Sequence, residues 1–122
     1  VKGLGELSAS WREVYPEYSY ESCLPRRPNG AMGSKYYYNL QSQHYLFKDG
    51  SSLIFKLTSG YYCWYDDEKV ADYSYEQEIV GGTGRFEGAA GTNLHSGTYY
   101  EIEYAAGVDT GYAIGTGVMN IQ

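Results

Sequence analysis

The sequence predicts an all-β protein, a single up-and-down antiparallel β-barrel of about eight strands. Short aromatic and β-branched runs alternate with turn residues along the chain, and no segment has the apolar spacing of a long amphipathic helix. The connections are too short for crossover helices, so neighbouring strands must be antiparallel. Closure into a barrel would remove both sheet edges. A flattened sandwich is the alternative, but the in-strand glycines Gly88, Gly91, Gly115 and Gly117 favour the coiling of a barrel.

One domain is expected, because the chain has 122 residues of which 43% are hydrophobic. Residues 1–10 are small and polar and predict a loose lead-in, and residues 11–122 form the barrel domain. A loop is expected over residues 21–34, which hold two prolines and an Asn-Gly pair. Asp49-Gly50 predicts a hairpin turn. The expected strands are 11–20, 35–40, 43–47, 52–59, 61–65, 73–80, 85–92, 98–104 and 112–121.

The most ordered glycine-rich run lies between Ile79 and Thr92. Its centre, with Gly81, Gly82, Gly84 and Arg85, predicts a structural turn with a positive φ at Gly84. We expect Arg85 to pair with a carboxylate or to bind a backbone carbonyl. The run is not a phosphate loop, because it lacks the Lys-Ser/Thr pair and the following helix that would hold an anion.

The second half of the chain resembles the allene oxide cyclase-like and dirigent-like β-barrel superfamily. The resemblance covers residues 43–122 and rests on four elements in order: Phe47-Lys48-Asp49-Gly50-Ser51-Ser52-Leu53, Gly60, the GGTGRF motif of residues 81–86 with its flanks, and Gly115-Thr116-Gly117-Val118. It implies a calycin-like barrel of eight strands whose apolar lumen holds a reactive small molecule, and it implies homo-oligomers. The motif shapes a turn and carries no catalytic group, so no catalytic residue is transferred.

Charge and hydropathy exclude two classes of partner. The formal net charge is −6 and the isoelectric point about 4.8, with Arg26-Arg27 as the one dense basic pair. Nucleic acid and anionic lipid both require basic residues to neutralise phosphates, so neither is expected. The mean hydropathy is −0.50, and no apolar run approaches the roughly 20 residues of a membrane helix.

The two cysteines, Cys23 and Cys63, are 40 residues apart. That spacing excludes a CxxC redox motif, and two ligands are too few for a structural zinc site. A disulfide is favoured over two buried free thiols, and it would stabilise the fold by about 3–4 kcal/mol. Because the chain begins at Val1, we expect an exported protein, secreted or periplasmic, from which a leader has been removed.

The expected function is binding of a small apolar or aromatic molecule in the barrel lumen, with a cyclisation or isomerisation steered there by confinement. The pocket residues predicted from strand alternation are Leu53, Phe55, Leu57, Tyr73 and Tyr75. No cofactor is expected, and no catalytic motif is identifiable. The alternative is a non-catalytic extracellular protein whose tyrosine-rich outer surface, drawn from 16 tyrosines, mediates self-assembly or surface binding.

Three groups of polar residues are candidate sites of chemistry. Glu101 and Glu103 are expected on a solvated outer face, the alternative being a desolvated general acid. Asp66-Asp67-Glu68 predicts an acidic loop, because it lacks the ligand spacing of a calcium site. His44 and His95 have no companion at ligand spacing and are expected to be structural or surface residues. No metal site is expected.

Overall fold

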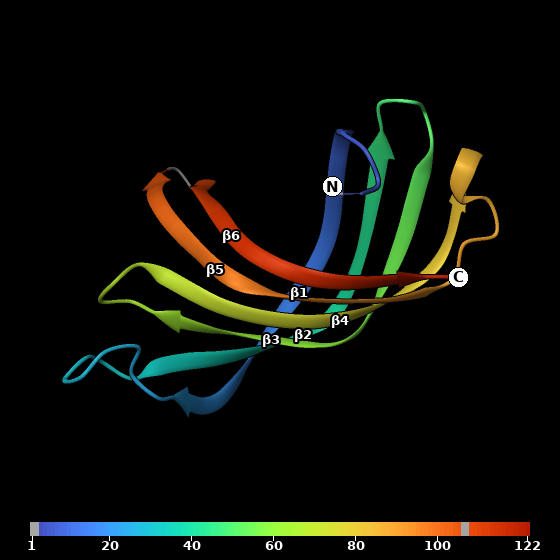
Figure 1. Cartoon of the computed structure of the whole chain (residues 1–122). Helices are drawn as coiled ribbons and strands as arrows, with labels where there is room; N and C mark the ends of the chain where they lie inside the picture. The colour runs from blue at the N-terminus through green and yellow to red at the C-terminus, as the bar shows by residue number, and fades with distance from the viewer. Residues whose placement is uncertain (1–2, 106–107) are drawn as a thin grey trace.

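The chain forms one antiparallel sheet of six long strands in up-and-down order (Figure 1). The structure, a computed structural model, describes residues 3–105 and 108–122. The strands are β1 (Leu7–Cys23), β2 (Gly33–Phe47), β3 (Ser52–Tyr65), β4 (Val70–Thr83), β5 (Gly91–Ala105) and β6 (Val108–Ile121), with a 3₁₀ turn η1 (Gly84–Phe86) between β4 and β5. The predicted all-β class and antiparallel order are confirmed.

The sheet is strongly curved, as in the wall of a β-barrel, so that one face is concave (Figure 1). Register shifts interrupt the ladders at Tyr15/Pro16, Leu57/Ser59 and Glu101/Glu103, and such bulges bend a strand and increase its twist. Each strand pairs with its neighbours in sequence. In the described part of the chain, no ladder joins β6 to β1.

The strands are fewer and longer than the sequence predicted. Residues 35–40 and 43–47 belong to the single strand β2, and residues 52–59 and 61–65 belong to β3. Gly60 was expected to end a strand, but it lies inside β3 opposite Tyr75. A Cβ at Gly60 would come within 2.7 Å of the Tyr75 Cβ and 2.9 Å of the Tyr38 ring. Gly60 therefore makes room for the side chains of Tyr38 and Tyr75, and it does not break the strand.

Two further boundaries differ from expectation. Residues 85–92 do not form a strand: the chain turns through η1, and β5 begins only at Gly91. The loose lead-in is also shorter than residues 1–10, because β1 begins at Leu7. Its pairing with Phe47 at the end of β2 extends the strand.

A hydrophobic core fills one end of the concave face. We call it the phenylalanine core, and its buried residues are Phe47, Leu53, Phe55, Ile79, Phe86 and Ala89. Segments on either side of the sheet complete it, because Leu4, Leu7 and Met119 pack against it. Phe86 and Ala89 come from the connection between β4 and β5, so this turn covers the end of the sheet.

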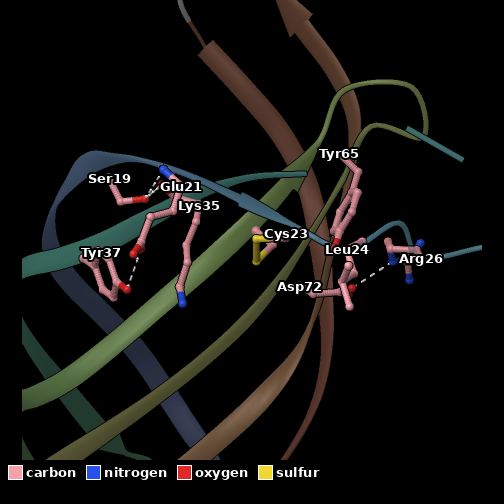
Figure 2. The surroundings of a disulfide bond; sticks show 10 residues. Ser19, Glu21, Cys23, Leu24, Arg26, Lys35, Tyr37, Tyr65 and Asp72 are labelled. Atoms are coloured by element: carbon pink, nitrogen blue, oxygen red, sulfur yellow. Dashed lines mark hydrogen bonds and ion pairs between the residues drawn. A yellow bond between two sulfur atoms is a disulfide. The ribbon is translucent and has the colours of Figure 1, made fainter. Parts of the chain in front are cut away.

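At the other end, a disulfide joins β1 to β3 (Figure 2). The predicted bond between Cys23 and Cys63 is confirmed, with the two Cα atoms 6.1 Å apart. The loop that follows Cys23 is tied down beside it: the Tyr65 hydroxyl donates to the Leu24 carbonyl at 2.7 Å, and Arg26 pairs with Asp72 at 2.9 Å. Among the described residues, no helix is long and apolar enough to span a membrane.

Candidate functional site: an aromatic cavity on the concave face

The concave face holds a cavity of about 1280 Å³. Every strand contributes to its lining, because the curvature turns one face of all six strands towards the same space. Representative lining residues, one from each strand in order, are Arg12, Tyr38, Tyr62, Tyr75, His95 and Ala113. This volume exceeds the roughly 300–1,000 Å³ of typical small-molecule pockets, so the cavity has room for a small organic ligand and stays open to solvent.

Tyrosines form a continuous cluster along this cavity. We call Tyr36, Tyr38, Tyr62, Tyr73 and Tyr75 the phenol cluster. Tyr36 stacks on Tyr62 with ring centroids 4.8 Å apart, and Tyr62 contacts Tyr38 at 5.4 Å. Tyr38 meets Tyr75 edge to face at 6.5 Å, and Tyr75 stacks on Tyr73 at 5.9 Å. These separations are those of favourable aromatic pairs, so the rings present both faces and edges to the cavity.

His95 extends the aromatic surface onto β5. Its ring lies 5.5 Å from Tyr73 and 5.2 Å from Tyr75, measured between centroids. Its Nδ1 is buried and has no hydrogen-bond partner among the described residues. Such an atom is costly to leave unsatisfied.

Glycines form the surface on which these two rings rest. A Cβ at Gly97 or Gly115 would lie 2.6 Å or 2.5 Å from the Tyr73 hydroxyl oxygen, and one at Gly117 would lie 2.9 Å from the His95 ring. Gly97 pairs with Gly115, and His95 with Gly117, across β5 and β6. The rings therefore lie directly on backbone, a packing mode that large residues would forbid.

A ladder of buried amides separates the phenol cluster from the phenylalanine core. The Gln77 side-chain amide donates to the Gln43 oxygen at 2.9 Å, and that of Asn93 donates to the Gln77 oxygen at 2.9 Å. Gln77 and Asn93 are 0% and 4% exposed. Three polar side chains thus link β2, β4 and β5 at this level, with β2 and β4 joined across the intervening β3.

Burial shifts the pKa values of Tyr62, Tyr75 and His95 so that each favours its neutral form. Burial raises the pKa of Tyr62 to about 12 and raises that of Tyr75 further. Burial lowers the pKa of His95, and the nearby Arg12 guanidinium lowers it again. Arg12 forms no ion pair with a residue that the structure describes. The inner part of the cavity is therefore a neutral aromatic wall with one cation beside it.

The rim carries charges that satisfy one another. Lys69 pairs with Asp66 at 2.8 Å, and both line the cavity together with Glu101. The expectation that Glu101 and Glu103 share a solvated outer face is wrong for Glu101. A register shift between them breaks the two-residue alternation, so Glu101 lines the cavity while Glu103 is exposed.

The five predicted pocket residues fall into two groups. Tyr73 and Tyr75 line the cavity. Leu53 and Phe55, which are 0% and 1% exposed, lie in the phenylalanine core, and Leu57 lies opposite Gln77 at the level of the amide ladder. All five share the concave side, as the alternation indicated, but only two reach open space.

Sequence reasoning missed the contribution of β1, β2 and the second half of β3 to the site. Arg12, Tyr38 and Tyr62 were not singled out, and His95 was assigned a structural or surface role. The signal was present for Tyr36 and Tyr38, which alternate within one strand. The sequence does not show which face of the sheet these two side chains occupy, however, because bulges in β1 and β3 shift the register on both sides.

The glycine turn is a structural site, as expected. Gly84 has φ +63°, and Gly81 and Gly82 lie at the C-terminal end of β4, just before the turn. Arg85 pairs with Asp49 at 2.7 Å, donates to the Leu4 carbonyl, and lies over the Phe86 ring at 4.3 Å. It therefore does both things that the sequence suggested, joining the N-terminal segment to the turn.

The other polar groups also have structural partners. The acidic loop of residues 66–68 is confirmed as such: Arg27 pairs with Asp67 at 3.0 Å, and Arg26 with Glu68 at 3.1 Å. His44 stacks on Trp11, with the ring centroids 4.9 Å apart. In the described ranges, no three His, Cys, Asp or Glu side chains gather as metal ligands would.

Outer tyrosines are present but mostly dispersed. Tyr15 and Tyr20 are 58% and 87% exposed on β1. Tyr37 and Tyr61 pair across β2 and β3, and the Lys35 ammonium lies over both rings at 5.1 and 4.5 Å.

Comparisons of the chain with protein-family models, with curated proteins and with solved structures found no match.

Proposed function

We propose that the concave cavity binds a small planar aromatic molecule that carries an anionic group. The observation that carries this proposal is the combination, around one open cavity, of the phenol cluster, His95 and Arg12. Among the described residues, the buried His95 Nδ1 has no hydrogen-bond partner and Arg12 forms no ion pair. Flat rings would stack against the tyrosines. A carboxylate or phenolate would approach Arg12, whose planar guanidinium suits such groups.

Confinement is the chemistry that this wall supports. On the inner wall, Tyr62, Tyr75 and His95 are not held in a charged, nucleophilic form, because burial favours the neutral form of each. We therefore place the protein among binding proteins that act by selecting one conformer of a ligand, and steering of a ring closure would follow from that selection. Membership of the allene oxide cyclase-like superfamily, suggested by the GGTGRF motif, is part of this proposal.

A direct test is titration with 2-naphthoate, followed by the fluorescence of Trp11 and Trp64, which both line the cavity. Saturable quenching is expected. The methyl ester should bind at least about tenfold more weakly, because it lacks the charge that Arg12 would meet. Cyclohexanecarboxylate should also bind more weakly, because it has no flat π face.

Two pairs of variants separate the two features. Tyr73→Leu should weaken naphthoate binding, whereas Tyr61→Leu, on the outer face, should not. Arg12→Gln should abolish the preference for the acid over the ester, whereas Lys56→Gln, an exposed β3 residue, should leave it intact. Equal affinities for all three probes, or equal effects of the paired variants, would exclude this function.

A further inference from the structure

The two edges of the sheet differ in how they are protected. β1 carries Arg12, Glu13, Glu17 and Glu21 and is interrupted by Pro16. Its ladder to β2 has three register shifts. Charges, proline and bulges are the devices that keep an edge strand from pairing with another molecule. β1 has all three.

β6 has none of these protections over most of its length. Residues 110–121 contain no Asp, Glu, Lys, Arg or Pro. From Gly111 to Ile121 they pair with β5 without a register shift. In the part of the chain that the structure describes, β5 is the one strand that pairs with β6. Its second side therefore offers a long, regular row of backbone donors and acceptors.

The convex side of β6 is also apolar. Ile114 and Val118 are 64% and 62% exposed, Tyr112 is 50% exposed, and Leu94 of the neighbouring β5 is 52% exposed. An added strand would cover these side chains while it completed the backbone ladder. The edge and the adjoining apolar strip are thus one continuous surface.

We propose that β6 pairs antiparallel with β6 of a second copy of this chain, which would join two sheets into one. The chain has a net charge of −6, so two copies repel each other over most of their surfaces. The charge-free β6 edge is where that repulsion is least. Pairing with β1 of another copy would instead desolvate four charged side chains against an uncharged strand.

A two-fold axis at Gly115 illustrates how well β6 matches itself. Ile114 would then lie opposite Thr116, and Tyr112 opposite Val118, so no charged residue would face another in residues 110–121. An isologous contact of this kind closes on itself and yields a dimer, not a filament. Residues 110–120 of each strand would then pair and span only about 37 Å, a small interface for which we expect a micromolar dissociation constant.

Sedimentation velocity from about 1 to 300 µM protein tests the proposal. The wild type should shift from monomer to dimer across this range. The double variant Ile114→Lys/Val118→Lys should stay monomeric with an unchanged far-UV spectrum and melting temperature. Ile102→Lys, at an equally exposed residue of β5 (68%), should dimerise like the wild type.

The salt dependence of dimerisation is an independent test. Because association brings two acidic molecules together through uncharged strands, added sodium chloride should strengthen the dimer by screening their repulsion. A dimer that weakens in salt would instead rest on charge pairs and would overturn the proposal.

A spin label on Thr116→Cys measures the contact without changing the apolar residues. Paired β6 strands should place the two labels within about 20 Å of each other. Absence of that distance, a wild type that stays monomeric at every concentration, or a lysine variant that still dimerises would each overturn the β6 contact. If the dimer is absent but the protein still binds naphthoate, the β6 proposal fails while the proposed cavity function stands.

Discussion

Removal of the Cys23–Cys63 disulfide should cost about 4 kcal/mol of unfolding free energy. The bond closes a loop of 40 residues, and the loop-closure entropy for that length corresponds to roughly 4 kcal/mol at 25 °C. The free energy of the folded state should change little. Cys23 pairs with Gly33 and Cys63 with Lys35 on the shared strand β2, so hydrogen-bonded ladders hold the two positions together without the bond.

The experiment compares the wild type with Cys23→Ala/Cys63→Ala in urea at 25 °C, with midpoint and slope fitted together. The midpoint should fall, and the slope should rise because the unlinked chain exposes more surface when it unfolds. Melting should drop by on the order of 15 °C for a domain of this size.

Wild type treated with dithiothreitol is the control, because it breaks the bond without removing the sulfur atoms from the partly buried site. The two should agree within about 1 kcal/mol. A loss below about 1 kcal/mol in both would refute the reasoning, since it would mean that the unfolded chain gains little freedom when the link is cut.

Three further outcomes are expected. Gly84→Val should cost about 2–4 kcal/mol, because the residue has φ +63° and a Cβ would clash with the neighbouring loop. Gly88→Ala, also at positive φ but with open space around its Cα, should cost clearly less in the same thermal melts, and equal losses would contradict the clash. Gln77→Leu should cost about 1–3 kcal/mol in urea unfolding, since it strips the Asn93 amide of its acceptor; an unchanged midpoint would mean that water replaces it. Unfolding free energy should fall as pH rises above about 10, because unfolded tyrosines ionise there while folded Tyr62 keeps its proton until about 12. Phenolate absorbance that saturates near pH 10 without unfolding would count against the buried phenol cluster.

The class and order of the fold were predictable because they depend on local patterns. Alternation over residues 73–80 placed Tyr73, Tyr75 and Ile79 correctly on one face, and Asp49-Gly50 is the turn that its composition predicts, with Gly50 at φ +86°. Strand number was not predictable in the same way. Gly60 is locally a strand breaker, but its tertiary role is to admit the rings of Tyr38 and Tyr75, and only the paired strands reveal that.

The candidate site was half predictable for a related reason. Alternation identifies which residues share a face, but it says nothing about how far along the barrel axis the core ends and open space begins. Alternation therefore assigns Leu53, Phe55 and Tyr75 equally to the pocket, although Leu53 and Phe55 lie in the core and Tyr75 lines the cavity. At Glu101 and Glu103, a bulge reverses the alternation itself, and no local signal announces it.

The bond between the ends of β1 and β3 has a consequence for proteolysis. The peptide between Arg26 and Arg27 lies in an irregular loop, and it is the kind of bond that trypsin cuts. Cys23 lies before that bond and Cys63 after it, so a chain nicked there remains a single covalent molecule until it is reduced. The ion pairs to Glu68 and Asp67 would hold both new ends in place. Nicked protein would thus keep its fold and its cavity, and it would reveal the cut only on a reducing gel.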